Sequence, residues 1–272
     1  MILKGLILFA SAQILGLLTA QRYLSALQSA NLSLPGLKFS FWDIFVSSAI
    51  LLIFIFFVFR QGRPSRIFFK IFLWLVIFSG SQIVFSVFLS PTVALIVFVL
   101  FLILVLAIPR VAIQNLAVIL GITGISSMLG LSLTPMTAVI LLALFSVYDI
   151  IAVYFTGHMI KMAENMIQSK AIFGLIIPNK FSDFKEKTGK MRLGEQFMIL
   201  GSGDVALPLI LVSSLVRVSL SQAWLVAGFA VVGFVVTHLL FANQKERRPM
   251  AALPPIAAMS ILGYLITNFF IW

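Results

Sequence analysis

The chain has 272 residues, of which 61% are hydrophobic and only 10% are charged, and its formal net charge is +11. A soluble domain has about 25% charged residues, so this composition excludes a water-soluble globular protein and predicts an integral membrane protein. The sequence contains no cysteine, which excludes disulfides and thiol chemistry. The positive charge does not indicate a nucleic-acid partner, because Lys and Arg of membrane proteins collect beside anionic lipid headgroups.

Apolar windows follow one another along nearly the whole chain. A membrane-spanning helix needs about 20 mostly apolar residues. In chain order, nine windows qualify: 2–20, 42–59, 70–89, 92–109, 113–132, 136–160, 196–216, 222–242 and 250–272. We therefore predict an all-α polytopic membrane protein with nine transmembrane helices. Its parts would be 1–160 with helices one to six, a polar loop at 161–195, and 196–272 with helices seven to nine.

The distribution of Lys and Arg supports this count. With nine spans, sixteen of the nineteen basic residues fall on one side of the membrane, and only Arg22, Lys38 and Arg217 fall on the other. Basic residues prefer the inner side, so we expect the N-terminus inside and the C-terminus outside. The loop 161–195 then lies inside. Its apolar piece "AIFGLII" at 171–177 is too short to cross a bilayer, which leaves an interfacial or re-entrant segment and a partly disordered loop as alternatives.

Two of the eight acidic residues, Asp149 and Asp204, lie within predicted spans. Burying a carboxylate in a membrane helix costs about 2.5–3.5 kcal/mol, so such residues are candidates for function. Asp149 precedes Lys161 by 12 residues, and Asp204 follows Arg192 by 12 residues. At a helical rise of 1.5 Å per residue, both carboxyls would lie about 18 Å from these inner charges. Because the two spans are consecutive and antiparallel, we expect the carboxyls to face each other at one depth.

Two carboxyls a few ångströms apart in a low dielectric do not both ionise readily, so one keeps its proton while the other acts as a base. This pairing can hydrolyse a peptide bond, since the base activates a water and the acid polarises the carbonyl. Neither a metal nor a cofactor is required. Gly201 and Gly203 leave room before Asp204 for water or a substrate backbone, and Tyr148 offers a hydroxyl beside Asp149. Close helix packing is the alternative interpretation of these small residues, and Pro208 is expected to bend the following helix.

The motifs "YD" at 148–149, "LGSGD" at 200–204 and "ALP" at 252–254 together resemble the presenilin and signal peptide peptidase family of GxGD intramembrane aspartyl proteases. The resemblance covers the whole chain, and the small size is similar to that of microbial homologues of the archaeal type. It implies that Asp149 and Asp204 are catalytic. It also implies that substrate binding and support of the site involve the motif residues Tyr148, Gly201, Ser202, Gly203, Ala252, Leu253 and Pro254.

The ninth-span motif departs from the family pattern, because Ala251 stands where the family usually has proline. We expect Pro249 and the pair Pro254–Pro255 to keep this stretch from forming a regular helix. Non-helical backbone near the two aspartates could pair with an unwound substrate as a strand. Ala252, Leu253 and the segment before the seventh span are candidates for that role.

Three other functions are compatible with parts of this sequence. A proton- or ion-conducting protein could use the same buried carboxylate pair, but repeated or matching broken helices typical of transporters are not found. A rhomboid-type serine protease is disfavoured, because "GISS" at 124–127 lacks the closing glycine and His158 and His238 have no clear depth match to Ser126. Prepilin peptidases share the GxGD motif but have fewer spans and no comparable ninth-span motif.

The expected partners follow from these predictions. We expect transmembrane peptides or membrane proteins as substrates, the lipid bilayer of the cell membrane as the environment, and no nucleic acid, metal or cofactor. The many Gly, Ala and Ser residues also permit self-association into a homo-oligomer.

Overall fold

The computed structural model describes residues 1–30, 63–155, 166, 172–187, 197–244 and 250–270, and most of these residues are helical. Within these ranges, a single short strand pair interrupts the helices. In chain order, the elements are α1 (Ile2–Ser29), α3 (Arg63–Phe88), α4 (Pro91–Ala107), α5 (Val111–Ser132), α6 (Pro135–Ile150), the π-helix η1 (Ile151–Phe155), β1 (Gly174–Pro178), the 3₁₀-helix η2 (Phe181–Lys185), β2 (Phe197–Gly201), α8 (Ser202–Leu215), α9 (Leu220–Ala242) and α10 (Leu253–Phe270).

Five helices among the described residues are long and apolar enough to cross a membrane, namely those at Ile2–Ser29, Lys70–Phe88, Val111–Ser132, Pro135–Phe155 and Leu220–Ala242. Shorter apolar helices occupy Pro91–Ala107, Ser202–Leu215 and Leu253–Phe269. Eight of the nine predicted windows thus contain an apolar helix. The window 42–59 lies outside the described residues, so the count of nine spans and the orientation stay predictions.

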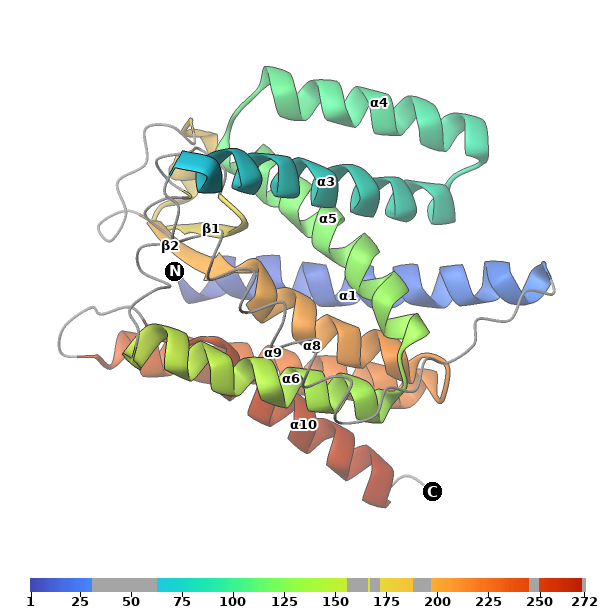
Figure 1. Ribbon diagram of the computed structural model, residues 1–272, viewed down its shortest axis with the longest axis vertical. Coiled ribbons are helices and arrows are strands. Elements are labelled where there is room, and N and C mark those ends of the chain that lie inside the picture. The colour runs from blue at the N-terminus through green and yellow to red at the C-terminus, as the bar shows by residue number, and fades with distance from the viewer. Residues whose placement is uncertain (31–62, 156–165, 167–171, 188–196, 245–249, 271–272) are drawn as a thin grey trace.

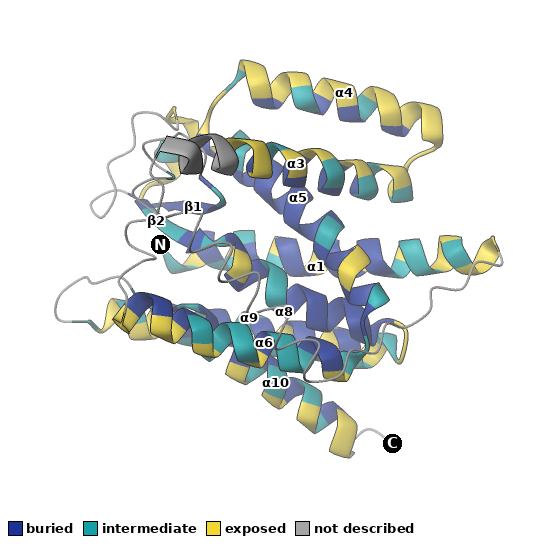
Figure 2. Ribbon diagram, in the orientation of Figure 1, coloured by how far each residue is buried: buried dark blue, intermediate teal, exposed yellow. Residues whose placement is uncertain are grey.

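Helix α5 crosses the other helices diagonally and lies at the centre of the bundle (Figure 1). It contacts α1, α3, α4 and α8. Small residues let it approach α3 closely, because a Cβ atom on Gly80 or Gly124 would overlap the backbone of the other helix. The buried face of α5 is accordingly almost continuous along its length (Figure 2).

Helix α4 lies at the edge of the molecule and contacts mainly α3 (Figures 1 and 2). Its exposed positions carry large apolar side chains, which include Leu95, Leu100 and Leu106 at 61%, 60% and 67% exposure. Such a surface suits contact with lipid hydrocarbon rather than water. The composition of the chain and the exposed apolar faces of its helices agree on an integral membrane protein.

Strands β1 and β2 form an antiparallel pair with Gly174 opposite Gly201 and Pro178 opposite Phe197. The all-α prediction did not include this pair, and the prediction of a continuous helix over 196–216 was wrong at its start. The helix begins only at Ser202, because the chain before it pairs with β1 instead. The predicted alternatives for the "AIFGLII" segment were a re-entrant and a disordered stretch. Its residues from Gly174 onward instead form the buried strand β1.

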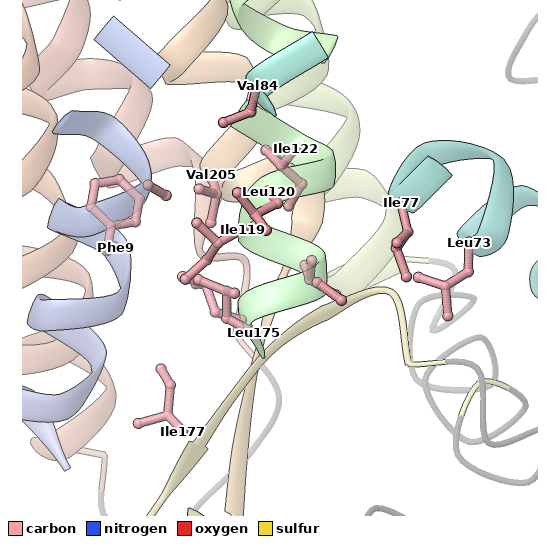
Figure 3. Packing of buried hydrophobic residues seen from close by; sticks show 14 of the residues in the cluster. Phe9, Leu73, Ile77, Val84, Ile119, Leu120, Ile122, Leu175, Ile177 and Val205 are labelled. Atoms are coloured by element: carbon pink, nitrogen blue, oxygen red, sulfur yellow. The ribbon is translucent and has the colours of Figure 1, made fainter. Parts of the chain in front are cut away.

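The strand pair belongs to the interior, since apolar side chains cover both of its faces. One face meets the main core, where Figure 3 shows Leu175 near Leu120 of α5 and Val205 of α8, with Phe9 of α1 beyond them. The other face packs in a small cluster of Val111, Ile172, Ile176 and Phe197. The position of β2, and therefore the start of α8, is fixed by packing from both sides.

The expectation that the stretch 251–255 is not a regular helix holds for residues 251–252 and is wrong from Leu253 onward. Helix α10 begins at Leu253, so both prolines lie in its first turn, where the lack of an amide hydrogen leaves no helical bond unmade. Only residues 250–252 are non-helical before it. Pro249 lies outside the described residues.

Candidate active site

Asp149 lies in the last turn of α6 and is 4% exposed. Directly after it the helix widens into the π-helix η1. Its Oδ2 accepts a hydrogen bond from the backbone N–H of Leu253 at 3.2 Å. Its Oδ1 is buried and accepts no hydrogen bond from any residue that the structure describes. Asp149 therefore combines one fixed oxygen with one that is open to a further donor.

Asp204 lies in the first turn of α8 and is 6% exposed. Its Oδ2 accepts a hydrogen bond from the backbone N–H of Gly201 at 3.1 Å. A Cβ atom on Gly201 would lie 3.0 Å from this Oδ2, so glycine lets the strand end approach the carboxyl closely. The side chain thus caps the helix that carries it, where the helix dipole favours a negative charge.

The two carboxyls are close enough for a direct electrostatic interaction. Helices α6 and α8 contact each other, and both contact α10. Asp149 and Asp204 therefore lie on neighbouring helices, as their expected meeting requires. The depth estimate that suggested it was wrong for Asp204, because strand β2 occupies 197–201, where a helical rise was assumed.

The contacts of Ile176 show which main-chain groups of β2 point away from β1. Both main-chain groups of Ile176 bond the side chain of Asn115, each at 2.7 Å. In an antiparallel pair the N–H and C=O of one residue point to the same side, so those of Ile176 point away from β2. Its partner Ile199 then directs its own N–H and C=O away from β1. These groups of Ile199 have no partner among the described residues, and they lie five residues before Asp204.

The remaining predicted site residues differ in their burial and in their contacts with the two carboxyls. Tyr148 is half-buried and close enough to interact electrostatically with Asp149. Ser202 is buried at the start of α8, whereas Gly203 is exposed and has open space where a side chain would project. Leu253 contacts Asp149 directly, and its neighbours Ala252 and Pro254 are half-buried on either side of it.

Of the residues considered for a serine mechanism, Ser126 is buried on α5. Ser127 lies on α5, and its hydroxyl is hydrogen-bonded to the carbonyls of Gly16 and Thr123 at 2.7 and 2.6 Å. His238 is buried on α9, and His158 lies outside the described residues. Within the described ranges, no three His, Asp or Glu side chains gather as a set of metal ligands.

Sequence reasoning missed three buried polar side chains that touch the backbone around the site. Asn115 bonds β1 as described above, the Nε2 of Gln13 donates to the carbonyl of Val205 at 3.2 Å, and Thr237 contacts the carbonyl of Ala252 at 3.3 Å. All three are 1% exposed. The available signal was a polar residue inside an apolar window, which is weak because such residues also bond their own helix.

Comparison with known proteins agrees with this arrangement. The family model described as signal-peptide peptidase, presenilin aspartyl protease matches residues 5–271. Two crystal structures of a presenilin family intramembrane aspartate protease are similar to the chain. The one in space group C222 has 23% identity and a TM-score of 0.62, and the match covers 97% of this chain and 98% of the other. The one in space group P2 has 25% identity and a TM-score of 0.61, with 96% of each chain covered.

No match was found among the curated proteins. The fold and the composition define an integral membrane protein with the fold of a presenilin family intramembrane aspartate protease. The family match spans nearly the whole sequence, so the chain belongs to the signal-peptide peptidase and presenilin aspartyl protease family.

Proposed function

We propose that the protein hydrolyses peptide bonds within transmembrane segments and that Asp149 and Asp204 are its catalytic pair. The observation that carries the proposal is that these two buried carboxyls come from helices that pack against each other, in a chain of a protease family. Both lie in a bundle with apolar outer faces. A substrate would therefore arrive from the lipid, and we propose the cell membrane as the location.

The proposed reaction needs one proton shared between the two carboxyls. The ionised carboxyl removes a proton from water as the water oxygen bonds to the scissile carbonyl carbon, and the protonated carboxyl gives its proton to the carbonyl oxygen. The resulting gem-diol then breaks its C–N bond. The nitrogen takes a proton from the carboxyl that had removed it from water, and a gem-diol hydroxyl returns a proton to the other. The products are a carboxylic acid and an amine, and the pair returns to its starting state.

Which carboxyl starts as the base is a property of the coupled pair. Each accepts one main-chain N–H, from Leu253 in one case and from Gly201 in the other. The unpaired and buried Oδ1 of Asp149 supports a role for this oxygen in contacting the water or the substrate carbonyl.

We propose further that the unwound substrate binds along the outer edge of β2. A helix in lipid has its amides paired, so the substrate must open before it is cut and its backbone then needs partners. The N–H and C=O of Ile199 are directed to this edge and could pair with an added strand. The open space at Gly203 would let that strand pass close to Asp204. Ala252, Leu253 and Pro254 would line the Asp149 side of the same path.

The test uses purified protein in lipid vesicles and a fluorogenic peptide with a single transmembrane segment. We expect cleavage by the wild type and none by Asp149→Asn or Asp204→Asn. Asp183→Asn is the matched control, because Asp183 is a half-buried carboxyl on η2, outside the proposed pair, and its loss should leave the rate unchanged. Cleavage that survives both substitutions in the proposed pair would exclude the mechanism. A proton flux that the same two changes abolish would then favour the conducting alternative.

A further inference from the structure

Thr237 lies on α9 and is 1% exposed, and its hydroxyl has two carbonyl neighbours. One is the carbonyl of Gly233, one turn earlier in the same helix, at 2.9 Å. The other is the carbonyl of Ala252, just before α10, at 3.3 Å. A threonine that only bonds its own helix needs the first neighbour alone. The second contact links α9 to the segment beside Asp149.

The Ala252 carbonyl and the Leu253 amide belong to the same peptide group. Its carbonyl oxygen contacts Thr237, and its N–H donates to Oδ2 of Asp149 at 3.2 Å. Because a peptide group is planar and rigid, holding its oxygen also fixes the direction of its N–H. Successive hydrogen bonds along such a group also strengthen one another. The hydroxyl of Thr237 and the carboxyl of Asp149 therefore bond the two polar ends of one rigid peptide group, so the first can orient the donor of the second.

Two neighbouring features make this link specific. A Cβ atom on Gly233 would lie 2.7 Å from the Cα of Ile256, so glycine at this position lets the first turn of α10 lie directly against α9. That approach brings the short Thr237 side chain within reach of Ala252. Pro254 and Pro255 have no amide hydrogen, so Leu253 is the only residue of 253–255 that can donate a main-chain bond to Asp149.

We propose that Thr237 is a positioning residue for Asp149, which acts by orienting the Ala252–Leu253 peptide. This inference rests on the proposed function, since it assigns Thr237 a role in the same reaction. Without the hydroxyl, the peptide can rotate and the Asp149 carboxyl loses its fixed donor. The part of the substrate path along β2 is on other residues, whereas Ala252 and Leu253 line its Asp149 side. The main effect should therefore be on kcat, with a smaller effect on substrate binding.

The experiment compares Thr237→Val, which keeps the shape and removes the hydroxyl, with Thr237→Ser, which keeps the hydroxyl. The vesicle assay described above gives kcat and KM, and the melting temperature in detergent reports folding. We expect Thr237→Val to lower kcat about tenfold, equivalent to about 1.4 kcal/mol, with a smaller change in KM. Thr237→Ser should restore most of kcat. Thr19→Val is the matched control, because Thr19 is fully buried and, among the described residues, its hydroxyl bonds its own helix at the Leu15 carbonyl. The kcat of this variant should equal that of the wild type.

The outcomes separate this inference from the proposed function. If Asp149→Asn is inactive while folded Thr237→Val has the wild-type kcat, the positioning role is wrong and the protease proposal stands. If Asp149→Asn is active, the protease proposal is wrong, and the positioning role of Thr237, which rests on it, is wrong as well. If Thr237→Val does not fold, Thr237→Ala replaces it in the comparison. Failure of both to fold, with Thr237→Ser stable, would show that the hydroxyl serves the fold alone and would overturn the inference.

Discussion

The side chain of Asn115 should hold the strand pair in place, and its replacement by leucine tests this role. Asn115 is 1% exposed on α5 and forms two hydrogen bonds of 2.7 Å with the N–H and C=O of Ile176. Leucine has nearly the same size but neither donates nor accepts. Both main-chain groups of Ile176 would then be buried without partners. At about 1–3 kcal/mol for each such group, the expected loss of stability is about 2–6 kcal/mol.

The loss of stability should affect the strand pair before the rest of the bundle, because β1 is paired with β2 on its other side. Strand β2 in turn leads into Asp204. Hydrogen exchange at the amides of β1 and β2 measures it. With tenfold in rate for each 1.4 kcal/mol, exchange should speed up by a factor of about 30 or more. Cleavage of the transmembrane peptide should fall as well, since β2 sets the start of α8.

Gln114→Leu is the matched control for this experiment. Gln114 is the neighbouring amide side chain on α5 and donates one partly buried bond of 3.1 Å, to the carbonyl of Ile172. Its loss should cost about 1 kcal/mol and leave exchange in the strands nearly unchanged. If Asn115→Leu and Gln114→Leu gave the same exchange rates and the same activity, the reasoning about Asn115 would be refuted.

Three further changes have defined outcomes. Gly80→Ala places a Cβ atom against the backbone of α5 and should lower stability by about 1–3 kcal/mol in a melting experiment, whereas Gly228→Ala, which has open space, should be neutral or stabilising. Gln13→Leu removes the buried donor to the Val205 carbonyl and should cost about 1–3 kcal/mol and reduce cleavage, with equal activity contradicting this role. Bonds from the Ser182 hydroxyl and the Lys180 amide lower the pKa of Asp183 from its ordinary value of 3.8, so its small stabilisation of η2 is present above that pH and is lost as the pH falls through the lower folded pKa; NMR of the Lys180 amide should show this transition in the wild type and not in Asp183→Asn.

The candidate carboxyls could be predicted from the sequence because charge is rare inside apolar windows. Asp149 and Asp204 stand out on that ground alone, and their proximity agrees with the prediction. Most helices could be predicted for a related reason, since an apolar run of about 20 residues has few alternatives in a membrane. Both inferences use only local composition.

The strand pair could not be predicted in this way. "FMILG" at 197–201 is an apolar run of five residues, and periodicity does not separate a short buried strand from the first turns of a helix. Its strand conformation depends on β1, which lies more than twenty residues earlier in the chain. The start of α10 was mispredicted for a different reason, because Pro254 and Pro255 break a helix interior but fit its first turn.

These two mispredicted places explain how the bundle holds two buried carboxyls. Asp204 accepts the N–H of Gly201 at the start of α8, and Asp149 accepts the N–H of Leu253, the first residue of α10. Each carboxyl thus lies at the N-terminus of a helix, where free amides and the helix dipole favour negative charge. A helix running without interruption through either segment would use these amides for its own bonds. The strand end at Gly201 and the late start of α10 at Leu253 therefore supply each aspartate with the backbone donor that it needs in an apolar surrounding.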